Sequence, residues 1–367
     1  DGTGTAINAA SGRIEASGEE TAGIFAEGAG ILVNEGTILV SGDEPAGTGI
    51  SGDGAFSARN SGTITISAPG SVGVGLAGPG VMASNEGAIE TTATFGIGLA
   101  VLGDALEAAN TGTIVGSGSG TIGIAATGFD VAGLALDLGE GASIFLDGGV
   151  RQTGAGSVGI VTAANDSAIS VNANLEVTGS DSVAVASFGE GIRIDVNEDI
   201  EARGVETTIF QFGDAAESFL LTDLRGLAAD DVVLTIDAGI NEAALDFSGG
   251  SRLLSGFGNG YSIVNRGQTI AGLQDGIAIT QSATAPVAIS NDTGGWLRLD
   301  GTAFDIVAPD GDVGIGNQLD ATIEARDLGI IRDLTNFTLV NDGTMTASGD
   351  GDLEPIGLHV TTESVGA

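Results

Sequence analysis

Four short segments decide the fold of this chain: NEGTI at 34–38, NSGTI at 60–64, NEGAI at 85–89 and NTGTI at 110–114. Each begins with asparagine, carries glycine two residues later and ends on isoleucine, and successive copies begin 26, 25 and 25 residues apart. A unit of this length cannot bury its own apolar face, so it must stack on further copies of itself. The pattern therefore predicts a solenoid.

The same period extends along the whole chain. A hydrophobic residue recurs about every 25.5 residues, at Ile14, Ile38, Ile64, Ile89, Ile114, Ile144, Ile169, Ile194, Phe219, Leu245, Ile270, Leu297, Ile323 and Met345. Because a solenoid grows without enlarging its core, we expect one elongated domain of about 14 coils of about 25 residues.

Within each coil the apolar residues alternate with polar or small ones. Ile64 and Ile66 flank Thr65, for example, and this spacing of two is that of a strand with one buried face. A Gly-rich apolar run such as VGVGL at 72–76 and a run that leads into asparagine, such as ILVN at 31–34, complete the coil. The fold class that follows is all-β, a single-stranded parallel β-helix solenoid with three short strands per coil.

The Asn-x-Gly corner predicts a ladder along the solenoid axis. Asparagine and glycine both adopt left-handed backbone angles, so we expect the pair to turn the chain between strands. Asparagines stacked in register can hydrogen-bond through their amides. The ladder residues are Asn34, Asn60, Asn85, Asn110, Asn265 and Asn341, and Asn165, Asn241, Asn291 and Asn317 follow the pattern more loosely.

We interpret residues 1–367 as one continuous β-helix and as a window of a longer protein. The last residues, Ser364-Val365-Gly366, begin another copy of Ser71-Val72-Gly73. The repeat is less regular near 127–141, 203–239 and 326–337, where we expect looser coils or loop insertions. Insertions in a solenoid form exposed loops, and partners often bind there.

The charge of the chain restricts its partners. It has 11 Lys and Arg residues, all of them arginine, against 49 Asp and Glu, which gives a net charge of −38. Such a surface repels phosphate backbones and anionic lipid, so we expect no nucleic-acid partner and no binding to bare membranes. No apolar stretch approaches the roughly 18 residues of a membrane span, so this segment should not insert directly.

The corner segments at 34–38, 60–64, 85–89 and 110–114 make the chain resemble the passenger domains of autotransporters and large adhesins of Gram-negative bacteria. That resemblance implies a right-handed parallel β-helix at the cell surface or outside the cell, held at the outer membrane through regions absent from this chain. It also implies a stalk or adhesive role. The partners would be a host or neighbouring cell, through a glycan or matrix component, or further copies of the chain.

Enzymes on parallel β-helices are the catalytic alternative, and they require clustered carboxylates and a base. The adjacent acids are Asp230-Asp231 and Glu19-Glu20, and Arg225 or Arg252 would have to serve as the base. His359 is the sole histidine, which excludes a multi-histidine metal site, and we expect it to be an outward-facing strand residue. We therefore expect no catalytic residues and no cofactor other than calcium.

Three further features are candidate ligand contacts. Asp310, Asp312, Asp350 and Asp352 lie in two Asp-Gly-Asp turns that resemble pieces of calcium loops, so they are the calcium candidates. Trp296 and Tyr261 are the large amphipathic aromatics that could stack on a sugar, and Trp296 should point outward because it precedes the inward Leu297.

Taken together, these features favour a non-catalytic secreted or surface-exposed adhesin or stalk that presents binding loops. A self-assembling extracellular filament, sheath or surface layer is the second reading, because uncapped strand edges invite pairing between copies. A polysaccharide-active β-helix enzyme is the third.

Overall fold

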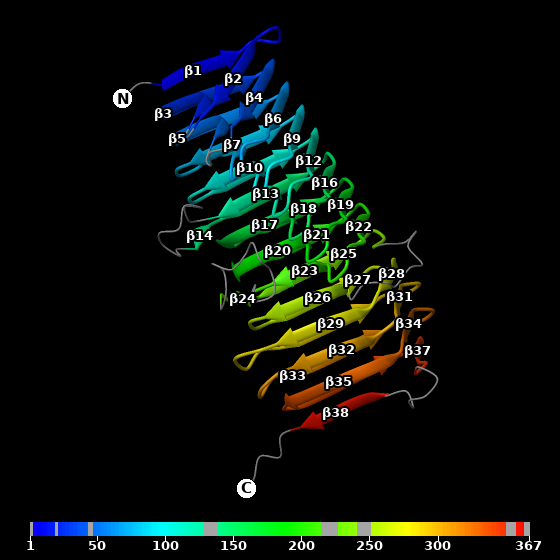
Figure 1. Cartoon of the computed structure of the whole chain (residues 1–367). Coiled ribbons are helices and arrows are strands. Elements are labelled where there is room, and N and C mark those ends of the chain that lie inside the picture. The colour runs from blue at the N-terminus through cyan, green and yellow to red at the C-terminus, as the bar shows by residue number, and fades with distance from the viewer. Residues whose placement is uncertain are drawn as a thin grey trace.

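The structure is a computed structural model that describes residues 3–18, 21–42, 47–127, 138–213, 227–240, 251–349 and 357–362. Within these ranges the chain winds into about 13 turns of an all-β solenoid, with no helix (Figure 1). Neighbouring turns pair in parallel at every described ladder. The predicted fold class is thereby confirmed. No described segment forms a helix with the length and apolar character that a membrane span requires.

Three faces run along the solenoid. Face 1, which leads into the asparagine corner, contains β1 (Thr3–Asn8), the second halves of β3 (Ala22–Asn34) and β5 (Thr48–Asn60), β8 (Met82–Asn85), β11 (Leu106–Asn110), β15 (Ala142–Leu146), β18 (Ala168–Val171), β21 (Arg193–Val196), β25 (Val232–Ile236), β27 (Tyr261–Asn265), β30 (Val287–Asn291), β33 (Asp312–Asn317) and β36 (Asn336–Asn341). Face 2, which follows the corner, contains β2 (Arg13–Ser17), β4 (Thr37–Ser41), β6 (Thr63–Ile66), β9 (Ala88–Thr91), β12 (Thr113–Gly116), β16 (Val150–Gln152), β19 (Leu175–Val177), β22 (Ile200–Ala202), β28 (Thr269–Leu273), β31 (Trp296–Leu299), β34 (Thr322–Ala325) and β37 (Thr344–Ala347).

Face 3 is the Gly-rich face. It contains the first halves of β3 and β5, followed by β7 (Val72–Ala77), β10 (Ile97–Leu102), β13 (Ile122–Thr127), β17 (Val158–Asn165), β20 (Val183–Glu190), β23 (Thr208–Phe212), β26 (Arg252–Phe257), β29 (Asp275–Thr280), β32 (Thr302–Val307), β35 (Asp327–Leu334) and β38 (Leu358–Thr362). Two short strands, β14 (Gly139–Glu140) and β24 (Ala229–Asp230), pair with the ends of β17 and β20.

The column of aliphatic residues after the corner is continuous, but part of its predicted membership is wrong. The observed column is Ile14, Ile38, Ile64, Ile89, Ile114, Val150, Leu175, Ile200, Ile240, Ile270, Leu297, Ile323 and Met345. Ile144, Ile169 and Ile194 belong instead to face 1, in register with Ala108. Phe219 and Leu245 lie outside the described residues.

Longer turns explain this error and the difference between 14 predicted and 13 observed turns. Ile114 and Val150 are neighbours in the column although 36 residues separate them, and Ile200 and Ile240 are neighbours across 40 residues. These stretches include much of 127–141 and 203–239, where insertions were predicted, and 128–137 and 214–226 lie outside the described residues. The segment 326–337 is occupied by β35 and the start of β36, and the pairing of β35 with β38 shifts register between Arg332 and Leu334.

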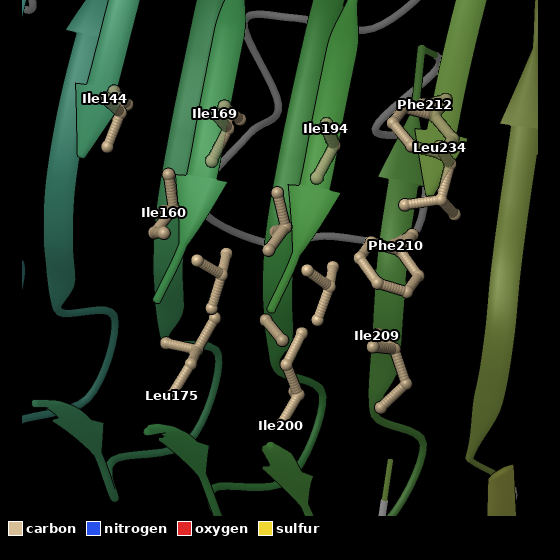
Figure 2. Packing of buried hydrophobic residues seen from close by; sticks show 14 of the residues in the cluster. Ile144, Ile160, Ile169, Leu175, Ile194, Ile200, Ile209, Phe210, Phe212 and Leu234 are labelled. Atoms are coloured by element: carbon tan, nitrogen blue, oxygen red, sulfur yellow. The ribbon is translucent and has the colours of Figure 1, made fainter. Parts of the chain in front are cut away.

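The interior of the rod is filled by these stacked side chains (Figure 2). Ile144, Ile169 and Ile194 are buried one above another on face 1. Farther along the axis, aromatic rings take over, with Phe210 stacked on Phe212 at a centroid distance of 6.3 Å. Burying an aliphatic side chain of this size contributes about 1.5–3 kcal/mol, so the columns are the main stabilising feature of the rod.

Asparagine side chains form the predicted ladder at the corner, but in two separate runs. In the first, each amide donates to the next oxygen from Asn8 through Asn34, Asn60 and Asn85 to Asn110, at 2.7–2.8 Å. The second joins Asn265, Asn291, Asn317 and Asn341 at 2.8–2.9 Å. Between the runs, the same position holds Leu146, Val171, Val196 and Ile236.

In this intervening stretch a polar ladder lies one residue farther along, where Asn197 donates to Asn172 and Asn172 to Asp147, each at 2.8 Å. Asn165 belongs to neither run, because its amide donates to Glu140 at 3.1 Å. Asn241 lies outside the described residues.

The corner glycines have a different role from the one predicted. Among the described residues, positive φ occurs at neither the asparagine nor the glycine of the four corner segments. A Cβ on Gly62 would lie 2.0 Å from the carbonyl oxygen of Gly36, and one on Gly87 would lie 2.0 Å from that of Gly62. Glycine is therefore required for close stacking of one turn on the next.

Candidate binding surface

The acidic pair on which the catalytic alternative depends lies where β24 ends, with Asp231 between β24 and β25. The Asp230 carboxylate accepts hydrogen bonds from the backbone and side-chain nitrogens of Asn259, at 2.6 and 3.1 Å. Asp231 adopts a left-handed conformation with φ of 50°. Arg252 lies on face 3 beside Asp275, at 3.9 Å, and Glu19, Glu20 and Arg225 lie outside the described residues.

The calcium candidates are only partly described. Asp310 has a φ of 54° and its backbone N–H donates to the Asp333 carbonyl at 3.0 Å. The Asp312 carboxylate accepts a 2.7 Å hydrogen bond from Asn336. Asp350 and Asp352 lie outside the described residues, and within the described part of the chain no three acidic or histidine side chains come together. Calcium binding therefore stays a prediction.

The two aromatic candidates have opposite environments. Trp296 points outward as predicted, with 39% of its surface exposed, and the Arg298 guanidinium lies 5.8 Å from its ring centroid. Tyr261 was expected as a sugar contact, and this is wrong, because it is 2% exposed and packs against Phe212 in the core. Alternation explains the difference, since Tyr261 is in register with the inward Val232 and Val287. His359 lies exposed on β38, as predicted.

Tyr261→Phe is expected to stabilise the fold by about 1 kcal/mol. The buried Tyr261 hydroxyl has no hydrogen-bond partner, so removing it from water on folding is destabilising. Burial raises the pKa of this phenol well above its ordinary value, and the Asp230 charge raises it further. The unfolded chain therefore loses this proton first, and stability falls as the pH rises above about 10. Urea unfolding at neutral and alkaline pH should show that the free energy of unfolding falls less with rising pH in Tyr261→Phe than in the parent chain. An equal decline in both proteins would contradict the assignment, since Tyr261 is the only tyrosine.

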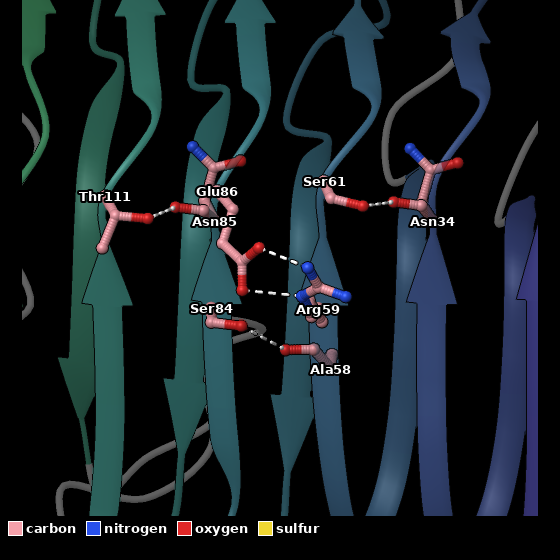
Figure 3. Close-up of polar contacts among 8 residues, drawn as sticks. All are labelled: Asn34, Ala58, Arg59, Ser61, Ser84, Asn85, Glu86 and Thr111. Carbon is pink, nitrogen blue, oxygen red and sulfur yellow. Dashed lines mark hydrogen bonds and ion pairs between the residues drawn. The ribbon is translucent and has the colours of Figure 1, made fainter. Parts of the chain in front are cut away.

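On the outer side of face 1, charged side chains link neighbouring turns. Arg59 donates two hydrogen bonds to the Glu86 carboxylate, one of them at 2.6 Å (Figure 3). These hydrogen bonds hold the pKa of Glu86 below its ordinary value. The hydroxyls of Ser61, Ser84 and Thr111 donate to backbone carbonyls of the preceding turn on the same side. Face 1 therefore has its polar groups largely paired between turns.

The outer side of face 3 is apolar over several consecutive turns. Its strands carry apolar residues on both sides, so strict alternation is lost. The outward positions form three columns in register: Val72, Ile97, Ile122, Val158 and Val183; Gly75, Ala100, Ala125, Val161 and Ala186; and Ala77, Leu102, Thr127, Ala163 and Phe188. In later turns the first column becomes polar, with Thr208, Arg252 and Asp275.

Toward the N-terminus this apolar stripe opens into a hollow of about 540 Å³. Val72, Ile97, Ala100 and Leu102 form much of its lining, and Phe95 stands beside them with 45% of its surface exposed. We call this hollow, with its lining residues between Thr48 and Leu102, the Phe95 groove. Sequence reasoning missed it, although the continuous apolar run VGVGL at 72–76 carried the signal.

Phe95 occupies a backbone conformation that normally requires glycine. Its φ is 57°, and glycine holds the same position in the neighbouring turns, at Gly70, Gly120 and Gly156, with φ of 63°, 69° and 67°. Farther along face 3 the position is held by Asp181 and Glu206, with φ of 53° and 56°. A bulky residue held there is strained by about 1–3 kcal/mol. Such strain at the rim of a hollow marks the Phe95 groove as the strongest candidate site.

A second hollow, of about 240 Å³, lies farther along face 3, and charged and apolar side chains both line it. Two loose ion pairs border it, Arg252 with Asp275 at 3.9 Å and Arg332 with Asp305 at 3.5 Å. Each pair joins groups of opposite charge on the protein itself, and pairs of this exposure contribute at most about 1 kcal/mol. The hollow therefore offers little unpaired charge to a ligand.

Comparison with known proteins finds one family similarity. Residues 1–115 match the family model for the BigA third pectate lyase-like domain. This segment comprises the first turns of the solenoid and includes the Phe95 groove. No curated protein and no solved structure matches the chain. The match agrees with the β-helix described above, and it covers less than a third of the residues.

Proposed function

We propose that this chain is part of a non-catalytic bacterial surface protein in which the β-helix acts as an adhesin-like stalk. The observation that carries the proposal is the unbroken stacking of turns between Asn8 and Asn341, with aliphatic columns and paired backbones throughout the described residues. At about 4.8 Å per turn, this stack is a rod on the order of 60 Å long.

Two further features support this role. BigA is a bacterial surface protein, and its third pectate lyase-like domain is the family that residues 1–115 resemble. A net charge of −38 makes neighbouring rods repel one another, which keeps them separate and extended at a surface. The partner of the rod would be a host or neighbouring cell, and the site of action the cell surface or the extracellular space.

A change of length tests the stalk role directly. Asn265 and Asn317 occupy equivalent ladder positions, so deleting residues 266–317 removes two whole turns and about 10 Å of reach. We expect bacteria that display the shortened full-length protein to adhere several-fold less to a host-cell layer. Replacing the deleted residues with a second copy of 61–110, also two turns, should restore adhesion. This copy would carry Phe95→Gly, so that it supplies length alone.

Two outcomes would contradict the proposal. If the replacement restores length and folding but not adhesion, the chemistry of residues 266–317 matters rather than their span. If the purified chain shortens polygalacturonate in the presence of calcium, the polysaccharide-active alternative is correct. We expect the polymer length to stay unchanged.

A further inference from the structure

We infer that the Phe95 groove binds an aliphatic, positively charged segment of another protein, an assignment that names a partner class for the proposed surface role. Face 3 carries apolar side chains on its outer side as well as its inner side, through Val72, Ile97 and Ala100. Ile97 and Ala100 are buried, whereas Val72 and Leu102 are half-buried and Phe95 is exposed. Part of this apolar surface therefore stays open, and exposed apolar surface beside a hollow commonly marks an interaction site.

The neighbouring part of the same stripe shows what covers such a surface. A second buried apolar cluster lies on the outer side of the sheet, and it joins Ile97 and Ala100 of the groove to Val158, Val161, Ala186 and Phe188 farther along face 3. Leu138 and Leu227 of this chain pack against that cluster. The covered stretch and the Phe95 groove share the same columns, so the groove continues a surface that already receives leucine side chains. A polypeptide with leucine-type side chains is the occupant of matching chemistry.

Two exposed phenylalanines flank the open stretch. Phe95 stands on the side of the covered turns, and Phe25, which is 59% exposed, is in register with Ser51 on the opposite side of the groove. Rigid aromatic side chains beside a hollow are typical anchors of protein interfaces. Glycine at position 95 would relieve the backbone strain that Phe95 causes there.

Charge selects among apolar partners. Glu27 and Asp53 are neighbours across β3 and β5 at the rim of the groove, both exposed. Neither has an ion-pair partner within the described part of the chain, and the net charge is −38. A fatty acid, an anionic lipid or an acidic glycan would be repelled, whereas lysine or arginine beside the aliphatic side chains would be attracted. The occupant is therefore basic as well as aliphatic.

Binding of synthetic peptides to the purified chain tests this inference without any cell. The probe is a fluorescein-labelled peptide of alternating leucine and lysine, and its composition controls alternate serine with lysine and leucine with glutamate. We expect the leucine–lysine peptide to bind at least ten-fold more tightly than either control. Phe95→Gly should weaken binding at least ten-fold while leaving the unfolding temperature equal or higher. Asp53→Asn should weaken binding a few-fold and reduce its dependence on salt.

A matched pair of substitutions locates the site. Gly75 and Ala278 occupy the same outward column of face 3, in β7 and β29, and both are half-buried. Gly75 lines the groove, so Gly75→Glu should abolish binding, and Ala278→Glu should leave it unchanged. The outcome that would falsify the groove assignment is unaltered binding in Phe95→Gly or equal losses in the two glutamate variants. If the serine–lysine peptide binds as tightly as the leucine–lysine peptide, attraction between opposite charges alone accounts for binding and the apolar groove is not involved.

Sedimentation velocity tests whether a second copy of this chain occupies the groove. If the wild-type chain dimerises and Phe95→Gly abolishes the dimer, the occupant is a second copy of this chain and the inference of a basic partner is overturned. If the replacement of residues 266–317 fails to restore adhesion while peptide binding is intact, that result would count against the stalk alone. The reverse result would count against the groove alone.

Discussion

Gly62→Ala is expected to destabilise the solenoid by at least about 3 kcal/mol, near the upper end of what overpacking costs. The added Cβ would lie 2.0 Å from the Gly36 carbonyl oxygen and 2.7 Å from the Glu35 carbonyl carbon. Both are backbone atoms of the preceding turn, so no side chain can rotate away, and the turns must separate. Separation would lengthen the Asn34–Asn60 hydrogen bond, now 2.7 Å. Urea unfolding followed by circular dichroism measures the loss.

Gly314→Ala is the matched control for this prediction. Gly314 lies in β33, its φ is not among the positive values of the described residues, and no atom lies within 4 Å of the Cβ that would be added. Alanine reduces the entropy that glycine loses on folding, so this variant should be as stable as the parent chain or more stable by up to about 1 kcal/mol. Similar losses in both variants would show that the corner glycine has no special role in stacking.

The period, the strand type and the asparagine ladder could all be predicted from the sequence. In a solenoid, equivalent residues touch their own copies, so a residue type required at one turn is required at the next. For this reason the sequence predicts the ladder of Asn34, Asn60, Asn85 and Asn110. It also predicts that Trp296 points outward, because Trp296 precedes the inward Leu297. The first ladder residue, Asn8, was missed because its corner, Asn8 to Gly12, is two residues longer than Asn34 to Gly36.

Other features were not predictable, because different structures give the same local pattern. Ile114 lies on face 2 and Ile144 on face 1, although both are isoleucines. The longer turn between them therefore moved the predicted repeat from one face to the other without any change of residue type. Tyr261 has the composition of a ligand contact, and only its register reveals that it is buried. The Phe95 groove depends on which side of the strand faces outward over three turns, and residues that are apolar on both sides of a strand do not reveal that.

The two ladder runs show that the corner position accepts either amide or aliphatic side chains, provided that neighbours match. Leu146, Val171, Val196 and Ile236 stack on one another at the position that asparagine fills elsewhere. In a run of asparagines each amide both donates and accepts, so one aliphatic residue leaves partners on both sides unpaired. A buried polar group without a partner is destabilising by about 1–3 kcal/mol. The ladder is therefore expected to tolerate substitution at its ends better than within.

Asn85→Leu is accordingly expected to destabilise the chain by about 2–5 kcal/mol, since it leaves the Asn110 oxygen without its donor and the Asn60 amide with only its longer hydrogen bonds to the Gly62 and Ala88 carbonyls, at 3.4 and 3.3 Å. Asn85 now accepts from Asn60 and donates to Asn110, each at 2.7 Å. Asn110→Leu is the control, because Asn110 ends the first run and Leu146 already follows it in register. This variant breaks one amide-to-amide hydrogen bond instead of two, together with the 2.9 Å hydrogen bond from Asn110 to the Gly148 carbonyl, and should lose less stability than Asn85→Leu. Urea unfolding of both variants measures the difference, and equal losses would mean that the amides act individually and not as a ladder.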